Sequence, residues 1–279
     1  MSNGNEEKMI EQEKRLKEKM SKIKHALIVM SGKGGVGKTS VAVNMACALA
    51  KFGKEIAILD TDIHGPNIAK MLGIEGQRMD QSATEIEPVP VYPNLKAVSL
   101  ALLGYPVDQP IIWRGPMKYS AIRQFLSDVN WGELDYLIID SPPGTGDEPL
   151  TVCQLIPQIT GAVIVSTPQD VAILDARKSI LFARELGIPV IGLIENMSGF
   201  ICPHCRHEID IFKKGGGEKT AKEMNVPFLG RIPFAEEIVS LCDAGTPFVQ
   251  GSGHSLSAQA MRDIVRKIEG VLINDSEKL

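Results

Sequence analysis

The sequence lacks any apolar run long enough to cross a membrane. No stretch approaches the roughly 18 apolar residues that a membrane helix needs. Its N-terminus is charged, and the first apolar run, residues 26–30, is far too short for a signal peptide. These absences predict a cytoplasmic location and no membrane partner.

An excess of positive charge is also lacking. The 30 Lys and Arg residues face 34 Asp and Glu residues, and the net charge of −4 argues against a general nucleic-acid-binding surface. The five cysteines are an odd number, which disfavours a disulfide framework. Metal ligation, reactivity and burial are the better interpretations of these thiols.

Short apolar runs alternate with helical stretches along most of the chain. Near-continuous apolar runs are typical of strands buried on both faces of a parallel sheet. The expected strands cover residues 25–31, 55–60, 134–140, 162–167, 189–195 and 228–232, and the expected helices include residues 38–52, 117–129, 171–186 and 217–224. This alternation predicts an α/β fold with a doubly wound, mostly parallel sheet flanked by helices.

Two segments depart from this alternation. Residues 1–24 hold charges of both signs with apolar residues at helical spacing, which predicts a charged helical arm that is solvated or loosely docked, with an arm that binds a partner as the alternative. Residues 75–92 are polar and contain prolines, so an irregular excursion is expected there. Because candidate site residues are spread through the rest of the chain, residues 25–279 are expected to form a single domain.

A glycine-rich loop precedes the first helix of this domain. Residues 32–39, Gly-Lys-Gly-Gly-Val-Gly-Lys-Thr, match G-x-x-x-x-G-K-[ST] between an apolar strand and a helix. The glycines let backbone N–H groups converge on phosphate oxygens, to which the helix dipole is also favourable. The candidate nucleotide-binding residues are Gly32, Lys33, Gly34, Gly35, Val36, Gly37, Lys38, Thr39 and Ser40, with Lys38 on the β- and γ-phosphates and Thr39 on Mg²⁺.

The extra lysine at position 33 makes this loop resemble the deviant Walker A loop of the nitrogenase-iron-protein, septum-site and chromosome-partition class of ATPases. The resemblance implies that Lys33 reaches the partner's nucleotide in a dimer. It also implies that Asp62 polarises the attacking water, and that Asp60 and Asp140 lie at the Mg²⁺ ion. Aspartates at a strand end can alternatively cap the next helix.

The same class resemblance places base recognition at two later positions. Asn196 follows the strand at residues 189–195, and Pro233 follows the strand at 228–232. The resemblance implies that Asn196 bonds the adenine edge and that Pro233 lines the purine. Asn196 is alternatively a turn residue at a strand end. The choice of ATP over GTP agrees with the lack of an Asn-Lys-x-Asp motif.

A C-x-x-C pair at residues 202–205 is the other chemical feature. Two thiolates at this spacing can bind one metal ion or cluster, but a closed zinc or cubane site needs about four ligands. Two chains that each contribute Cys202 and Cys205 would supply them on a two-fold axis. An intrachain zinc site completed by His204 and His207, and a redox pair, are weaker alternatives.

The motifs together resemble the Mrp/ApbC family of nucleotide-binding iron–sulfur cluster carriers over about residues 25–270. The segments that carry the resemblance are SGKGGVGKTS, DTDIHGPN, WRGPM, IDSPPGTGD and ENMSGF followed by CPHC. The resemblance implies a homodimer that holds a labile [4Fe–4S] cluster on its paired cysteines. It implies that the cluster passes to apo iron–sulfur proteins, coupled to slow ATP hydrolysis.

Two features depart from parts of that family. No cysteine precedes Cys47, so the N-terminal cluster of the eukaryotic branch is not expected, and the 24-residue arm is too short for the extra domain of many bacterial members. Two other functions stay open. A partition or septum-site ATPase would not explain the cysteine pair, whereas a dimeric ATPase with structural Zn²⁺ would, because thiolates bind both zinc and clusters.

Overall fold

The structure is a computed structural model that describes residues 3–63, 65–82, 85–104, 115–202, 204–205, 207–251 and 255–276. Its centre is a sheet of eight strands in the order β12-β9-β8-β1-β7-β2-β6-β5. Every pair of neighbours runs parallel except β5 and β6. The doubly wound, mostly parallel α/β fold predicted from the alternating pattern is therefore confirmed.

The strands of this sheet begin and end close to the predicted bounds. They are β1 (Ile23–Met30), β2 (Ile56–Asp60), β5 (Val89–Tyr92), β6 (Leu95–Val98), β7 (Leu134–Asp140), β8 (Gly161–Ser166), β9 (Val190–Glu195) and β12 (Phe228–Arg231). Strands β1, β2, β7, β8 and β9 are buried along nearly their whole length, as strands covered on both faces must be.

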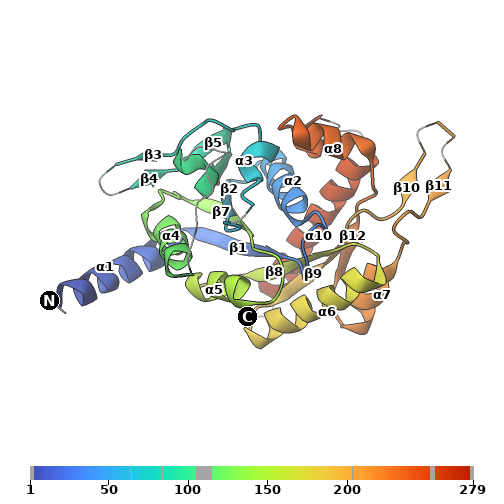
Figure 1. Ribbon diagram of the computed structural model, residues 1–279. Coiled ribbons are helices and arrows are strands. Elements are labelled where there is room, and N and C mark those ends of the chain that lie inside the picture. Colours follow the sequence, from blue (N-terminus) through green and yellow to red (C-terminus); the bar gives the residue numbers. More distant parts are fainter. Residues whose placement is uncertain are drawn as a thin grey trace.

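Helices cover both faces of the sheet, as Figure 1 shows. On one face α2 packs on the central strands, and α10 packs on α2, β9 and β12. On the other face α6 and α7 cover β8 and β9, and α4 and α5 continue that layer. The helices are α1 (Asn3–Met20), α2 (Lys38–Lys51), α3 (Ile68–Met71), α4 (Gly115–Asp128), α5 (Asp147–Leu155), α6 (Asp170–Glu185), α7 (Gly216–Glu223), α8 (Glu236–Asp243), α9 (Phe248–Gly251) and α10 (Leu256–Ser276), with a 3₁₀ turn at Leu100–Leu103.

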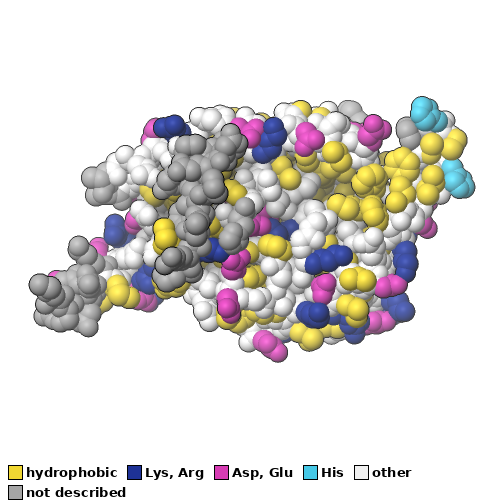
Figure 2. Space-filling view, viewed as in Figure 1, with side chains coloured by type: hydrophobic (Ala, Val, Ile, Leu, Met, Phe, Trp, Pro, Cys, Tyr) yellow, Lys and Arg dark blue, Asp and Glu magenta, His cyan; other side chains and the backbone are white. Residues whose placement is uncertain are grey.

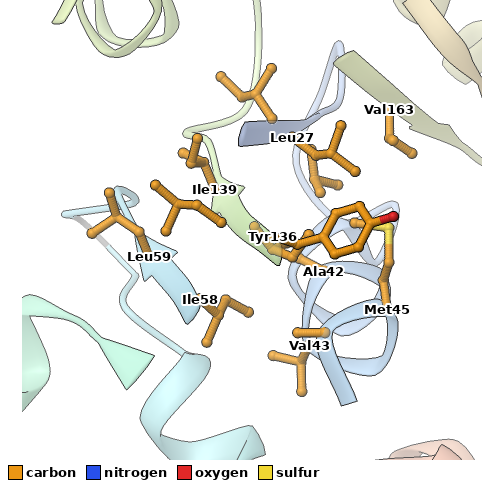
Figure 3. Close-up of a cluster of buried hydrophobic side chains, with 14 of the residues drawn as sticks. Leu27, Ala42, Val43, Met45, Ile58, Leu59, Tyr136, Ile139 and Val163 are labelled. Atoms are coloured by element: carbon orange, nitrogen blue, oxygen red, sulfur yellow. The ribbon is translucent and has the colours of Figure 1, made fainter. Parts of the chain in front are cut away.

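The core lies between α2 and the middle of the sheet. In Figure 3, side chains of Leu27, Ile58 and Ile139 from three neighbouring strands lie near Val43 and Met45 of α2. All five are fully buried. Burying a side chain of this size contributes about 1.5–3 kcal/mol. This packing holds rigid the two elements that flank the glycine-rich loop.

The expectation of an irregular excursion over residues 75–92 is wrong in part. The segment contains β3 (Asp80–Gln81), β4 (Ile86–Glu87) and the edge strand β5, which pairs antiparallel with β6. Pro90 lies within β5, and the proline suggested a loop. A proline is tolerated on an edge strand, because its missing N–H costs no bond when that side faces away from the sheet.

The two terminal helices pack on the body of the fold. Leu16 and Met20 of α1 are buried and α1 contacts α4, while Lys19 forms an ion pair of 2.6 Å with Glu85. The apolar side of α10 is buried, and Ile268 is fully inaccessible. Within the described residues, no helix is both long and apolar enough to span a membrane.

Candidate functional site

The glycine-rich loop, residues 32–39, joins β1 to α2 at the carboxyl edge of the sheet. Gly35 and Gly37 have φ near +80°, a conformation that glycine adopts without strain. A Cβ built on Gly34 or Gly35 would meet no atom within 4 Å, whereas one on Gly32 would lie 2.2 Å from the carbonyl oxygen of Asp175 in α6. The loop is thus closed on the side of α6 and open at Gly34 and Gly35.

Two side chains at the start of α2 converge on Asp140, the last residue of β7. The Lys38 ammonium donates to Asp140 Oδ1 at 2.6 Å, and the Thr39 hydroxyl donates to Asp140 Oδ2 at 2.7 Å. Lys38 and Asp140 are both buried. Strand register explains the meeting, because β1 and β7 are neighbours and the loop begins where β1 ends.

A second buried carboxylate, Asp60, ends β2 directly opposite Asp140. Burial raises the pKa of Asp60 well above its usual range, and the charge of Asp140 adds to this. Burial likewise raises the pKa of Asp140, although Lys38 opposes the shift. Two buried acids beside a threonine hydroxyl supply the oxygen ligands that Mg²⁺ prefers, and the cation's charge would stabilise both in their ionised forms. This donor set therefore fits the predicted metal.

Asp60 also takes part in the local turn that follows β2. It accepts hydrogen bonds from the backbone N–H of Asp62 at 3.1 Å and from the Ser99 hydroxyl at 3.1 Å. Its contact to the N–H of Ile68, where α3 begins, is long at 3.5 Å. Asp62 is half-buried and accepts from Gly65 at 3.4 Å. The helix-capping alternative thus describes part of the geometry of this pair of aspartates.

The remaining loop residues lie at the same edge of the sheet. Lys33 is half-buried and has no ion-pair partner within the part of the chain that the structure describes. The N–H of Gly144, in the loop after β7, donates to Ser31 at 2.8 Å. A Cβ on Gly146, which precedes α5, would meet nothing within 4 Å. The loop that follows Asp140 therefore touches the end of β1 and has space at its far end.

The two residues expected to recognise the base lie in different surroundings. The Asn196 side-chain amide donates to the Val36 carbonyl of the glycine-rich loop at 2.9 Å, and this contact is buried. Pro233 lines a hollow of about 590 Å³ together with Phe200 and residues of α8, and Asn196 is not part of the lining of that hollow. The structure therefore places the Asn196 side chain against the glycine-rich loop, and base recognition by the two residues stays a prediction.

The C-x-x-C pair lies at the far end of a projecting hairpin. We call β10 (Phe200–Ile201), β11 (Glu208–Ile209) and the residues between them the cysteine hairpin. Cys202 N–H donates to the His207 carbonyl at 3.0 Å. In Figure 2, apolar side chains gather between α8 and this hairpin, and histidines project at its end. Pro203 and Arg206 lie outside the described residues, as do His64 of DTDIHGPN and Trp113 and Arg114 of WRGPM.

The five cysteines fall into two chemical groups. Cys205 is exposed and Cys202 half-buried, and the backbone N–H of Cys205 and then that of His204 lower the pKa of Cys202. Burial instead raises the pKa of Cys47 to about 12 and that of Cys153 to about 11. The hairpin pair thus offers an exposed thiol at Cys205 and a thiol of lowered pKa at Cys202, whereas burial raises the pKa of half-buried Cys242.

Within the described residues, Cys202 and Cys205 are not joined by a third metal-ligating His, Cys, Asp or Glu side chain of the same chain. Throughout the described residues, no group of three or more His, Cys, Asp and Glu side chains is arranged to hold a metal ion. This includes His204 and His207, which the sequence offered as ligands for an intrachain zinc site. The geometry therefore disfavours that intrachain site.

Comparison with known proteins identifies the family. A family model described as NUBPL iron-transfer P-loop NTPase, of the ParA group, matches residues 22–269. The chain belongs to this family. The family-level resemblance drawn from the motifs is thereby confirmed. It makes this protein a P-loop NTPase, for which nucleotide hydrolysis is the general activity of the fold.

Several relatives of this chain are named iron-sulfur cluster carrier proteins. An iron-sulfur cluster carrier protein of Methanocaldococcus jannaschii is 51% identical over 94% of this chain and 91% of the relative. One from Pyrococcus abyssi is 48% identical over 91% and 88%. An Archaeoglobus fulgidus nucleotide-binding protein solved with ADP is 39% identical with a TM-score of 0.75, over 84% and 91% of the two chains. The Pyrococcus furiosus cell division ATPase MinD, at 21% identity, TM-score 0.64 and coverage of 89% and 99%, shares the fold.

Sequence reasoning missed one residue of this site, Glu195. It is fully buried at the end of β9, next to Asn196. The sequence did contain one signal, an acidic residue at the end of an otherwise apolar strand. A charge buried at such a position must have partners, because burial without them is too costly. Three of its four partners, Gly215, Gly217 and Arg231, lie 20 or more residues away, so no local motif marks it.

Proposed function

We propose that this protein binds and hydrolyses ATP and carries a [4Fe–4S] cluster, which two copies hold between them and pass to apo iron–sulfur proteins. The observation that carries the proposal is the combination of two features in one chain. The chain has a phosphate loop with an extra lysine, and it also has a projecting hairpin that carries two cysteines, half of a cluster's ligand set. The names of the relatives support the same function.

The nucleotide half of the mechanism follows from the loop. Its open backbone at Gly34 and Gly35 is suited to phosphate oxygens, and Lys38, the first residue of α2, would bind the β- and γ-phosphates. Thr39, Asp60 and Asp140 would hold Mg²⁺, which neutralises charge on the phosphates when bound. Asp62 would orient the attacking water, and the partner's Lys33 would stabilise transferring charge.

Lys38 has a second role in the folded protein. Its ion pair with Asp140 is buried, so the ammonium keeps a charged partner within the site. A buried charge without a partner is costly, by several kcal/mol. Phosphate oxygens offer Lys38 an alternative anionic partner. We propose that nucleotide binding exchanges these partners and frees Asp140 Oδ1, the oxygen that Lys38 occupies, for the metal.

The cluster half of the mechanism needs the second copy. Cys202 and Cys205 of each protomer would together provide four thiolates, the number that a [4Fe–4S] cluster takes. The hairpin extends from the body of the fold, which leaves these thiols reachable by a second protomer (Figure 2). A site assembled from two exposed pairs is open to solvent, which suits transfer of the cluster to a client.

A structural Zn²⁺ at the same four thiolates is the second candidate. One observation favours it equally, namely that the donor set consists of cysteine sulfur alone, which zinc also prefers. The two candidates differ in what the site does. A structural zinc site is closed and kept, whereas a carried cluster is labile and leaves.

Anaerobic reconstitution with iron and sulfide tests the proposal. We expect visible and Mössbauer spectra of a [4Fe–4S] cluster at one per two chains, and transfer of that cluster to an apo ferredoxin. A Cys202→Ala/Cys205→Ala variant should bind none. Tight stoichiometric zinc, with no cluster formed on the wild type, would contradict the carrier function.

A matched variant separates loss of ligands from loss of a cysteine in general. Cys242→Ala removes a thiol in α8 that contacts the Ser40 hydroxyl at 3.8 Å and lies outside the hairpin. This variant should form the cluster as the wild type does. A cluster lost equally in both variants would show that the hairpin pair is not its ligand set.

A further inference from the structure

Four charged side chains are buried within the described part of the chain, and three of them belong to the phosphate site. These three are Lys38, Asp60 and Asp140. The fourth, Glu195, contributes to neither the phosphate site nor the cysteine pair directly. A fully buried carboxylate is retained only where donors satisfy it. The elements that supply those donors therefore indicate the role of Glu195.

Four donors converge on the Glu195 carboxylate. Its Oε1 accepts from the Ser198 hydroxyl, from the Gly215 N–H at 2.9 Å and from Arg231 Nε at 3.3 Å. Its Oε2 accepts from the Gly217 N–H. A Cβ built on Gly217 would lie 3.0 Å from this oxygen, which is a tight contact, so the backbone approaches the carboxylate closely here. The carboxylate is therefore fully satisfied.

Two of these donors flank the segment that carries the cysteine hairpin. Ser198 lies shortly before β10, which begins at Phe200, and Gly215 lies after β11, which ends at Ile209. Phe234 N–H also donates to the Gly199 carbonyl at 2.8 Å, which fixes the entrance to the body of the fold. One carboxylate thus closes the base of the arm that carries both thiols.

The next residue along the chain contacts the phosphate loop. Asn196 donates its side-chain amide to the Val36 carbonyl at 2.9 Å, and a Cβ on Gly37 would lie 2.2 Å from that amide nitrogen. Met197, between Asn196 and Ser198, has φ of +56°, which few residues other than glycine adopt. A shift of the loop at Val36 would therefore act on a short, tightly constrained segment.

We propose that Glu195 is a positioning residue that couples the state of the phosphate loop to the geometry of the cysteine hairpin. The inference rests on the proposed carrier function, because it supplies the connection between its two halves. The connection runs from the loop at Val36 to the Asn196 side chain, along the backbone to Glu195, and from the Glu195 carboxylate to Ser198 and Gly215 on either side of the hairpin. Glu195 touches neither nucleotide nor cluster and acts only through these contacts.

The replacement Glu195→Gln tests the coupling. Glutamine keeps the shape but turns one acceptor oxygen into an NH₂ donor that faces backbone N–H groups. Iodoacetamide alkylation of Cys202 and Cys205 is measured by mass spectrometry on reduced protein that carries no metal or cluster on these cysteines. The rate is compared with and without added Mg²⁺ and a non-hydrolysable ATP analogue. In the wild type the analogue should change the alkylation rate by about fivefold or more, the scale of ordinary coupling between sites.

In Glu195→Gln the analogue should still bind but should leave the alkylation rate unchanged. Glu218→Gln is the matched control, because Glu218 also pairs with Arg231 but is exposed and has no bond to the hairpin segment in the structure. It should behave as the wild type does. A wild-type protein whose alkylation rate does not depend on the nucleotide would overturn the proposal. A Glu195→Gln variant whose rate still depends on it in full would do the same.

A milder variant provides a test that holds even if Glu195→Gln does not fold. Ser198→Ala removes one of the four donors and leaves the carboxylate, and it should reduce the effect of the nucleotide on alkylation. If Glu195→Gln does not fold, a Ser198→Ala variant whose alkylation rate responds to the nucleotide as fully as that of the wild type would overturn the coupling. The assay needs no iron or sulfide. Failure to form a cluster would contradict the carrier function, and absence of a nucleotide effect on alkylation would contradict the coupling. The two results are therefore measured separately.

Discussion

The contact between Gly37 and Asn196 permits a quantitative prediction. Alanine at position 37 would keep φ near +80°, which costs about 1–2 kcal/mol for a residue with a Cβ. The new Cβ would lie 2.2 Å from Asn196 Nδ2 and must displace it. Displacement leaves the buried Val36 carbonyl unsatisfied, at about 1–3 kcal/mol. We therefore expect Gly37→Ala to lower the free energy of unfolding by about 2–5 kcal/mol.

Gly35→Ala is the matched control for this variant. Gly35 has the same φ of +80°, but its Cβ would meet nothing within 4 Å. It should cost only the backbone contribution of about 1–2 kcal/mol. Urea unfolding and thermal melting without nucleotide measure both variants, and each kcal/mol corresponds to about 2–4 °C in a chain of this size. Equal destabilisation by the two alanines would refute the argument that Asn196 rests against the loop.

Three further predictions address other parts of the account. Lys38→Ala should abolish nucleotide binding, whereas Lys33→Ala should spare binding and impair hydrolysis; undiminished turnover in Lys33→Ala would contradict its action on the partner's nucleotide. At pH 8, iodoacetamide should leave Cys47 and Cys153 of the native protein unmodified, because burial raises their pKa to about 12 and about 11 and both remain protonated thiols; fast labelling by mass spectrometry would contradict this. Ile268→Ala should lower the free energy of unfolding by about 2–5 kcal/mol in urea, since this fully buried side chain joins α10 to the core, and a loss below about 1 kcal/mol would contradict that packing.

The parallel core of the fold was predictable because its signals are local. Strands buried on both faces are continuous apolar runs, and β7 at Leu134–Asp140 has the predicted bounds. The phosphate loop was equally predictable, because its glycines and lysine are adjacent in sequence. The edge strand β5 was not, since Pro90 suggests a loop unless it is known that the strand lies at an edge.

The connection between the two halves of the site was beyond sequence reasoning. Asn196 meets Val36, 160 residues away, and Glu195 meets Gly215 and Arg231, 20 and 36 residues away. Such contacts follow from the order of strands in the sheet, which brings β9 beside β8 and β8 beside β1. Motifs identified the loop and the cysteine pair separately. Only the fold shows that one residue lies between them.

The central claim is that two chains share one cluster, and native mass spectrometry after anaerobic reconstitution tests it most directly. The account predicts a dimer whose extra mass equals a single Fe₄S₄ unit, and predicts that the Cys202→Ala/Cys205→Ala variant lacks this mass. A monomer that carries its own cluster, or a dimer that carries zinc in place of iron and sulfide, would contradict the account.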